Sequence, residues 1–244
     1  MAGDPRKLAI VTGGAKGLGR HLCVRLAEAG YGILVNYLSS EAAAGKLVAG
    51  LGELGVAAWK LRADVARADE VAALFDAADQ TGLELGVVIN NVGIYNPVPL
   101  RQIDGEQWER TIATNLNGAF HVCRQALTRL QPGGQIINIG VSGNQLNQAE
   151  GFATDYYISK AALLQLTRAL AAEYAAGGTH GGIRLNMVSP GQLANSIGEV
   201  DGAPGQVPIG RDGSFEDVFG AVEYLLAADY VTGANIEVAG GYRL

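Results

Sequence analysis

The hydrophobic and polar positions of this chain alternate between two patterns. A short apolar run at 8–11 precedes a segment, 17–29, in which leucines and alanines recur every three or four residues. Gly30 follows that segment, and a second apolar run at 33–35 follows the glycine. Short continuous apolar runs are typical of buried strands, and the longer repeat is typical of an amphipathic helix. The pattern therefore predicts a strand, a helix and a strand in this order.

The same alternation continues along the chain. It predicts further helices at 40–52, 69–79, 105–130, 157–176 and 215–227, and further strands at 56–62, 87–90, 135–139, 183–188 and 234–238. Strands that are apolar throughout need cover on both faces, which the helices between parallel strands provide. No linker or shift in composition divides the sequence. We therefore expect a single α/β domain over 1–244, a doubly wound Rossmann fold whose seven-stranded parallel sheet carries helices on both faces.

Composition narrows the classes of partner. Hydrophobic residues make up 48% of the 244 positions and charged residues 17%, which is enough for a large core. The net charge is −6, and lysines and arginines are scattered, which argues against nucleic acid as a partner. Cys23 and Cys123 lack metal-ligand spacing, and no apolar run reaches the ~20 residues that span a bilayer. We expect a soluble cytoplasmic protein that acts on a small molecule, without a membrane or metal partner.

A glycine-rich turn joins the first predicted strand to the first predicted helix. It reads Thr12-Gly-Gly-Ala-Lys-Gly-Leu-Gly, so glycines stand at positions 13, 14, 17 and 19. Glycine allows the backbone to approach a pyrophosphate closely, and the exposed amides of a helix N-terminus favour its negative charge. In this context the turn predicts a dinucleotide site. The residues that we expect to contact the dinucleotide are Gly13, Lys16, Gly17, Leu18 and Gly19.

Tyr156 and Lys160 carry the clearest catalytic chemistry. They are four positions apart, and the apolar repeat after them predicts that they begin a helix. Residues at this spacing are neighbours on one helix face, so the ammonium should lie beside the phenol. The ordinary pKa of tyrosine is near ~10, and an adjacent positive charge lowers the pKa, which lets the phenol exchange protons with a carbonyl or alcohol oxygen. Helical spacing alone also nominates Tyr157, three positions from Lys160.

The spacing of the glycine turn, with Tyr156 and Lys160 downstream, resembles the short-chain dehydrogenase/reductase family. The resemblance covers essentially the whole chain and is greatest to the 3-oxoacyl-[acyl-carrier-protein] reductases. The segment Asn90-Asn-Val-Gly93 resembles the family's Asn-Asn-Ala-Gly motif, with Val92 in place of the alanine. The further matching segments, in chain order, are Asp64-Val65, Asn90–Gly93, Asn115, Pro190-Gly191, Ile209–Arg211 and Tyr230–Gly233.

The resemblance implies roles for these residues. Tyr156 would protonate the substrate carbonyl oxygen, while Lys160 would lower the pKa of the tyrosine and hold the nicotinamide ribose. Asn115 would hold a water that links the lysine to solvent. Around the cofactor, the family pattern places Asp64 and Val65 beside the adenine ring, Asn91 and Gly93 at the end of the fourth strand, and Pro190 and Gly191 beside the nicotinamide.

The family serine that binds the substrate oxygen has no unambiguous match. Aligned from the preceding strand, its position falls on Val141, and counted back from Tyr156 it falls on Gly143. Ser142 lies between the two, and a bulge at the strand end could present its hydroxyl to the site. Alternatively Ser142 only caps a turn, in which case Asn144 or Gln145 could supply the hydrogen-bond donor.

The end of the second strand favours NADP(H) over NAD(H). Members of the family that prefer NAD usually carry an acid there, whereas this chain has Asn36. A carboxylate would repel a 2′-phosphate and an asparagine would not. Lys16 could add a positive charge near that phosphate, and Ser39 and Ser40 could donate hydrogen bonds to it.

The predicted function is reduction of a ketone, such as a 3-oxoacyl thioester, by an NADP(H)-dependent enzyme. One alternative is an enzyme that reduces another carbonyl or a pterin-like imine. The other is a catalytically idle protein that binds the cofactor as a sensor or as an assembly subunit. Residues 192–207 would form a short substrate lid. Relatives assemble as tetramers or dimers through the long helices, so we expect a homo-oligomer. The apolar positions available for such contacts are Phe120, Val122, Leu163 and Leu166.

Overall fold

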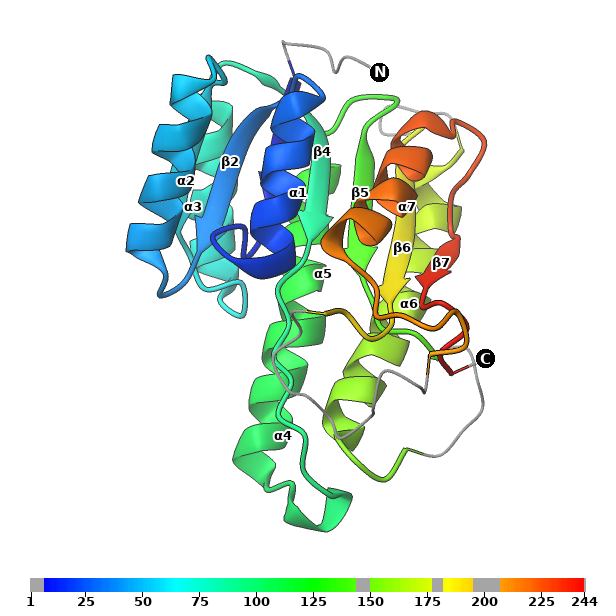
Figure 1. The fold of residues 1–244 in the computed structure, drawn as a ribbon. Coiled ribbons are helices and arrows are strands. Elements are labelled where there is room, and N and C mark those ends of the chain that lie inside the picture. Colours follow the sequence, from blue (N-terminus) through cyan, green and yellow to red (C-terminus); the bar gives the residue numbers. More distant parts are fainter. Residues whose placement is uncertain (1–6, 144–149, 177–181, 195–206, 244) are drawn as a thin grey trace.

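The computed structural model describes residues 7–143, 150–176, 182–194 and 207–243 (Figure 1). The strands that it contains are β1 (Lys7–Val11), β2 (Gly32–Tyr37), β3 (Ala58–Arg62), β4 (Glu84–Asn90), β5 (Gln135–Ile139), β6 (Arg184–Pro190) and β7 (Asn235–Val238). They form one 7-stranded sheet in the order β3-β2-β1-β4-β5-β6-β7. Every neighbouring pair is parallel, which confirms the predicted doubly wound sheet.

The helices follow the strands as the pattern predicts. They are α1 (Gly17–Glu28), α2 (Glu41–Glu53), α3 (Ala68–Asp79), α4 (Gly105–Ile112), α5 (Gly118–Leu127), α6 (Thr154–Tyr174) and α7 (Phe215–Ala227). The single helix expected at 105–130 differs, because a π-helical turn at Ala113–Asn117 separates α4 from α5 and α5 ends at Leu127. Gly118 follows this turn, and a Cβ there would lie 2.8 Å from a methyl carbon of Val65.

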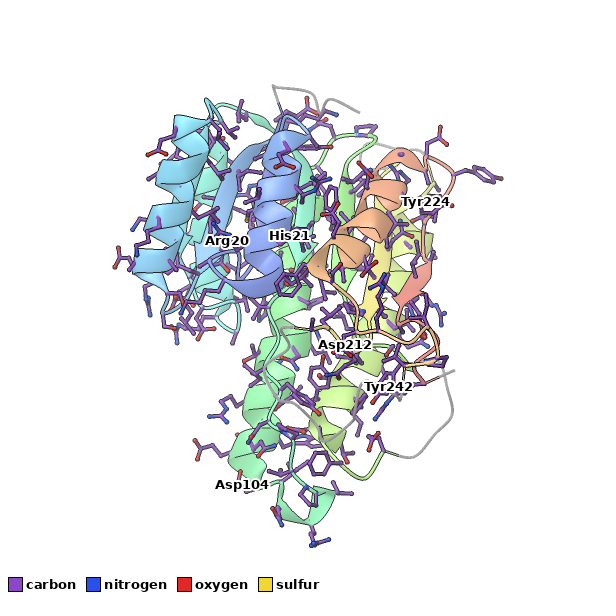
Figure 2. The ribbon with its side chains drawn as sticks, viewed as in Figure 1. Arg20, His21, Asp104, Asp212, Tyr224 and Tyr242 are labelled. Atoms are coloured by element: carbon purple, nitrogen blue, oxygen red, sulfur yellow. The ribbon has the colours of Figure 1, made fainter. Side chains whose placement is uncertain are left out.

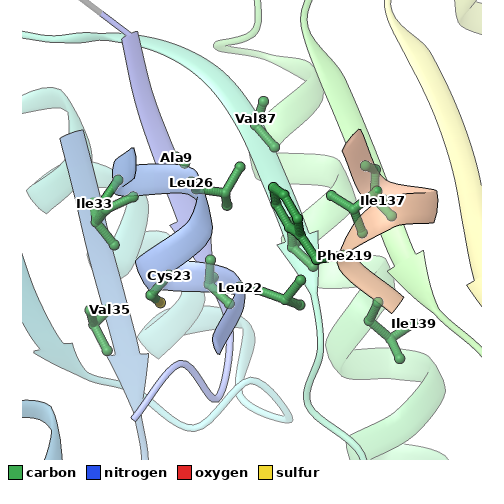
Figure 3. Packing of buried hydrophobic residues seen from close by; sticks show 14 of the residues in the cluster. Ala9, Leu22, Cys23, Leu26, Ile33, Val35, Val87, Ile137, Ile139 and Phe219 are labelled. Carbon is green, nitrogen blue, oxygen red and sulfur yellow. The ribbon is translucent and has the colours of Figure 1, made fainter. Parts of the chain in front are cut away.

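Alternate residues of each strand face opposite layers of helices. In β1, Ala9 and Val11 belong to one cluster with side chains of α1, α2 and α7. The close view of this cluster shows Ala9 near Leu26 of α1, and Phe219 of α7 in the same layer (Figure 3). Leu8 and Ile10 point the other way and pack with side chains of α3 and α5. Both sets are buried, which explains why β1 is apolar at successive positions rather than alternating with polar residues.

The carboxyl ends of the strands form the edge of the sheet at which polar residues gather. The order reverses between β1 and β4, the place where doubly wound sheets leave a crevice for ligands. In Figure 1, α4 and the first half of α6 extend past this edge. Among the described residues, none of the helices is both long and apolar enough to cross a bilayer.

Candidate active site

The glycine turn after β1 has the shape of a phosphate cradle. Gly13 and Gly17 have φ values of 62° and 53°, a left-handed conformation that glycine adopts without strain. A Cβ on Gly19 would clash with the main-chain oxygen of Gly13 and would lie 2.6 Å from Nδ2 of Asn91. Helix α1 begins here with no acidic residue in its first turn and no side-chain cap at Lys16. The turn therefore fits a pyrophosphate, whose charge the uncapped amides favour.

Hydrogen bonds from neighbouring strands hold this turn in place. Thr12 Oγ1 accepts from the main-chain nitrogens of Asn91 and Val92, at 3.0 and 3.2 Å. Asn36 is buried, and its Oδ1 accepts from Gly13 N at 3.2 Å while its Nδ2 donates to the oxygen of Ala63 at 2.9 Å. The Asn36 amide therefore holds the turn through both its oxygen and its nitrogen. The sequence had indicated only that this residue lacks the negative charge that would repel a 2′-phosphate.

A polar pocket lies beside the turn, at the start of α2. Its lining includes the side chains of Lys16, Ser39, Ser40, Glu41 and Lys46. The carboxylate of Glu41 accepts a hydrogen bond from Lys60 Nζ at 2.9 Å, and this bond lowers the pKa of Glu41. Because Lys60 balances Glu41, the charge of the two lysines that line the pocket remains in surplus. The pocket therefore has the donors and the charge of a phosphate site.

Lys160 lies on α6, one turn after Tyr156, and its side chain is buried against the end of β5. Its Nζ donates to the main-chain oxygen of Ile139 at 2.8 Å and lies 5.9 Å from the centre of the Tyr156 ring. Burial lowers the pKa of Lys160 to about 8, which leaves the ammonium mostly protonated at neutral pH. The structure thus brings the two residues together, with the ammonium anchored to the sheet.

Tyr156 is surrounded by other tyrosines. The ring of Tyr95 meets it edge to face at a centroid distance of 4.9 Å, and the ring of Tyr157 does so at 5.5 Å. Burial raises the pKa of Tyr156, and the nearby Tyr157 and Tyr95 raise it further. This direction is opposite to the lowered pKa expected from Lys160, because loss of water around the phenol is the largest effect. Tyr156 is therefore a neutral phenol at neutral pH, which is the form that can donate a proton.

Asn115 occupies the π-helical turn between α4 and α5. Its Oδ1 accepts from the main-chain nitrogen of Ile94 at 2.8 Å, and its Nδ2 donates to the oxygen of Ile94 at 3.0 Å and to Ser159 Oγ at 3.1 Å. A Cβ on Gly93 would lie 3.2 Å from Lys160 Nζ and 3.7 Å from Asn115 Oδ1. Asn115 therefore joins the loop after β4 to α6 beside the lysine. Turns of this kind are frequent at functional sites.

Ser142 follows β5 and lies at the same edge of the sheet. Its main-chain nitrogen donates to the oxygen of Pro190 at 3.0 Å. Its side chain is 1% exposed, and its Oγ has no hydrogen-bond partner among the described residues. A buried hydroxyl left without a partner costs about 1–3 kcal/mol, so this oxygen is suited to a ligand. Asn144 and Gln145, the alternative donors, lie outside the described residues.

The remaining expected cofactor residues lie around the same edge. Asp64 accepts a hydrogen bond from Ala66 N at 3.0 Å, and Val65 is buried. Gly191 N donates to the oxygen of Val238 at 3.0 Å, and a Cβ on Gly191 would lie 2.8 Å from Ala239. The chain at Pro190-Gly191 therefore passes close to the segment after β7. Most of the expected lid, 195–206, lies outside the described residues.

Sequence reasoning missed several residues of this region. Tyr95 comes two positions after a recognised motif, and Lys46 lies on the helix that follows the two serines, so projecting that helix would have found the lysine. Thr12 opens the glycine turn but carries no charge that draws attention. Glu150 and Arg243 had no sequence signal, because only the fold brings them together, in an ion pair of 2.8 Å.

Comparisons with known proteins find similar proteins over nearly the whole chain. A family model described as Enoyl-(Acyl carrier protein) reductase matches residues 13–243. The chain is 37% identical to 3beta-hydroxysteroid dehydrogenase 1 of Eggerthella lenta, over 98% of this chain and 94% of that protein. It is 34% identical to the 3-oxoacyl-[acyl-carrier-protein] reductase FabG of Staphylococcus aureus, over 96% and 97%. A crystal structure of blue fluorescent protein from a metagenomic library, in complex with NADPH, has a TM-score of 0.89 and 33% identity, and each chain is 98% covered.

Proposed function

Because this chain belongs to the short-chain dehydrogenase/reductase family of oxidoreductases, we propose that it reduces a ketone to an alcohol with NADPH. The observation that carries the proposal is the pairing of Tyr156, a half-buried neutral phenol, with the buried ammonium of Lys160 at the carboxyl edge of the sheet. A phenol that keeps its proton at neutral pH suits the acid of a carbonyl reduction.

The cofactor and three residues would each contribute one part of the reaction. Bound NADPH would supply the hydride that adds to the carbonyl carbon. Tyr156 donates its phenolic proton to the carbonyl oxygen, so that the carbon gains a hydride and the oxygen a proton. The Lys160 ammonium stabilises the phenolate that remains, until a proton from solvent restores the phenol. The hydroxyl of Ser142 donates a hydrogen bond to the same substrate oxygen as negative charge develops on it.

A panel of carbonyl compounds tests this proposal. NADPH oxidation is followed by absorbance with β-ketoesters, 3-oxoacyl thioesters, diketones, 3-ketosteroids and pterins. We expect turnover of at least one of the ketones. A protein that binds NADPH but reduces none of these compounds would instead support the sensor or assembly subunit. Reduction of pterins alone would identify an imine reductase.

The pocket at the start of α2 predicts a preference for NADPH. Replacing both Lys16 and Lys46 with alanine should weaken NADPH binding about tenfold, since each exposed lysine contributes a modest charge-assisted bond to a 2′-phosphate. NADH binding should not change. Isothermal titration of both cofactors measures the effect, with Lys7→Ala, at the opposite end of β1, as the control. If the affinities for NADPH and NADH fall equally, the pocket does not bind the 2′-phosphate.

Ser142 gives a prediction in which activity and stability separate. Ser142→Ala should lower kcat about 10²-fold, the usual effect of losing one donor to a developing oxyanion. The same variant should unfold at no lower temperature, because it removes a buried hydroxyl that has no partner among the described residues. Steady-state kinetics and thermal melts test both parts. An unchanged kcat would assign Ser142 to the turn instead.

We also propose that the protein is a cytoplasmic homo-oligomer, a tetramer or dimer. The structure corrects part of the sequence expectation, because Val122 and Leu163 belong to the core of the chain itself. Phe120 is 38% exposed, and Trp108 and Ile158 on the neighbouring helices are exposed to 38% and 44%. These apolar side chains support an interface over α4, α5 and α6. Light scattering after gel filtration measures the assembly, and a monomeric mass would contradict it.

A further inference from the structure

The segment after β7 returns to the beginning of α6. Arg243 Nη2 lies 2.8 Å from Glu150 Oε2, and the two side chains are only 30% and 27% exposed. The guanidinium carbon of Arg243 lies 4.7 Å from the centre of the Tyr157 ring and 5.6 Å from that of Tyr242. Figure 2 labels Tyr242 beside α6, at the edge where the strands end. Arg243 thus connects this segment to the helix that carries the catalytic tyrosine.

Glu150 holds the turn that leads into α6. Its Oε1 accepts from the main-chain nitrogen of Phe152 at 3.2 Å, and its main-chain oxygen accepts from Thr154 Oγ1 at 2.7 Å. Main-chain bonds also fix this turn, including the bond from Ala153 N to the oxygen of Val98 at 2.9 Å. Helix α6 has no side-chain cap at Ala153, the residue that precedes it. The contact between Arg243 and Glu150 therefore acts on a turn that has no side-chain cap.

Backbone strain marks both ends of this contact. In the described part of the chain, the residues other than glycine with positive φ are Ala153, at 52°, and Arg243, at 57°. Such conformations persist where surrounding interactions over-determine them, and they cluster at functional sites. One strained residue lies in the turn that Glu150 holds, and the other is the arginine that binds Glu150. Their coincidence indicates that the two segments hold each other in place.

We propose that Arg243 and Glu150 form a clamp that positions Tyr157 and, through it, Tyr156. Arg243 stacks on one ring, and that ring packs at 82° and 5.5 Å against the ring of Tyr156. The clamp adds a side-chain contact to the main-chain bonds that hold the start of α6. Arg243 is a positioning residue in this arrangement, and the inference rests on the proposed function of Tyr156.

The charges around Arg243 favour positioning over substrate recognition. Glu150 neutralises the guanidinium, and a second carboxylate, that of Glu237, accepts from Gly143 N at 3.4 Å nearby. Gly143 itself borders the arginine, because a Cβ there would lie 3.0 Å from Arg243 Cβ. With two carboxylates and one guanidinium, this region does not attract an anionic substrate. The guanidinium is instead engaged by the protein.

The test compares variants of the clamp with a matched pair elsewhere. Arg243→Ala and Glu150→Gln should each lower kcat about tenfold, because a displaced proton donor reacts more slowly, and both should leave KM and NADPH affinity unchanged. Arg243→Lys should retain part of kcat, because lysine keeps a positive charge that can pair with Glu150 and lie over the Tyr157 ring. Arg129→Ala is the control, since Arg129 also pairs with a carboxylate, Asp76 at 2.9 Å, and stacks on Phe75 at 5.6 Å. It should leave kcat unchanged.

Fluorine NMR of protein labelled with fluorotyrosine gives a readout that does not depend on activity. The signal of Tyr157, assigned with Tyr157→Phe, should shift in Arg243→Ala and remain unchanged in Arg129→Ala. An unshifted signal, or a kcat that falls no further than in the control, rejects the clamp. A rise in KM for acidic substrates in Arg243→Ala alone would show that Arg243 contacts substrate. If the wild-type protein reduces no carbonyl, the proposed function fails and the NMR signal still decides the clamp.

Discussion

Replacing Tyr156 with phenylalanine should lower kcat about 10³-fold, within the range expected for loss of a positioned proton donor. The phenylalanine ring keeps the edge-to-face contacts that the tyrosine ring makes with Tyr95 and Tyr157, at 4.9 and 5.5 Å. Only the hydroxyl is lost, so the fold and the glycine turn should be unaffected. Steady-state kinetics should show the loss in kcat, while NADPH titration should give the wild-type affinity.

Tyr157→Phe is the matched comparison, because helical spacing alone nominates both tyrosines as partners of Lys160. Burial raises the pKa of Tyr157 to about 12, and Arg243 opposes this rise. Both phenols are therefore protonated at neutral pH, and protonation does not distinguish them. The variant keeps the ring under Arg243 and should lose far less activity than Tyr156→Phe. If Tyr157→Phe is the inactive variant, the roles of the two tyrosines are exchanged.

The fold followed from the sequence because the central strands of the sheet, β2, β1, β4, β5 and β6, are buried on both faces. Runs such as Leu8–Val11 and Val87–Ile89 are apolar at every position, which leaves little choice but a parallel sheet between two helical layers. The π-helical turn at Ala113–Asn117 could not be predicted, since the apolar repeat continues through it. Its position depends on contacts of Asn115 with Ile94 and with Ser159, which are distant in sequence.

The candidate site could be predicted where residue spacing determines which side chains meet. It was harder to predict where burial determines the pKa of a side chain. Spacing identified the glycine turn and the pair formed by Tyr156 and Lys160. It gave the wrong direction for the pKa of Tyr156, because sequence does not show how completely a phenol loses water. The clamp between Arg243 and Glu150 joins segments 93 positions apart (243 − 150) and leaves no local pattern.

Lys160→Met should remove most activity and yet stabilise the folded protein at pH 7. Burial lowers the pKa of Lys160 from 10.5 to about 8 in the folded state. Below pH 8 both states carry the proton, and the folded state bears the full penalty of the buried charge. Between 8 and 10.5 the unfolded state binds more protons than the folded state, so stability rises with pH. The shift corresponds to a penalty on the order of 3 kcal/mol at pH 7.

Methionine fills a similar volume without the charge, but it loses the hydrogen bond from Lys160 Nζ to the oxygen of Ile139. That loss offsets about 1 kcal/mol, so we expect a net gain of about 2 kcal/mol at pH 7. The gain should shrink as pH rises toward 10.5, where lysine is neutral in the folded state. Urea unfolding at several pH values measures it, and kcat of the wild type should fall as pH rises above about 8. A variant that is less stable at pH 7 would show that the Lys160 ammonium stabilises the fold, and a variant that keeps wild-type kcat would show that it takes no part in the reaction.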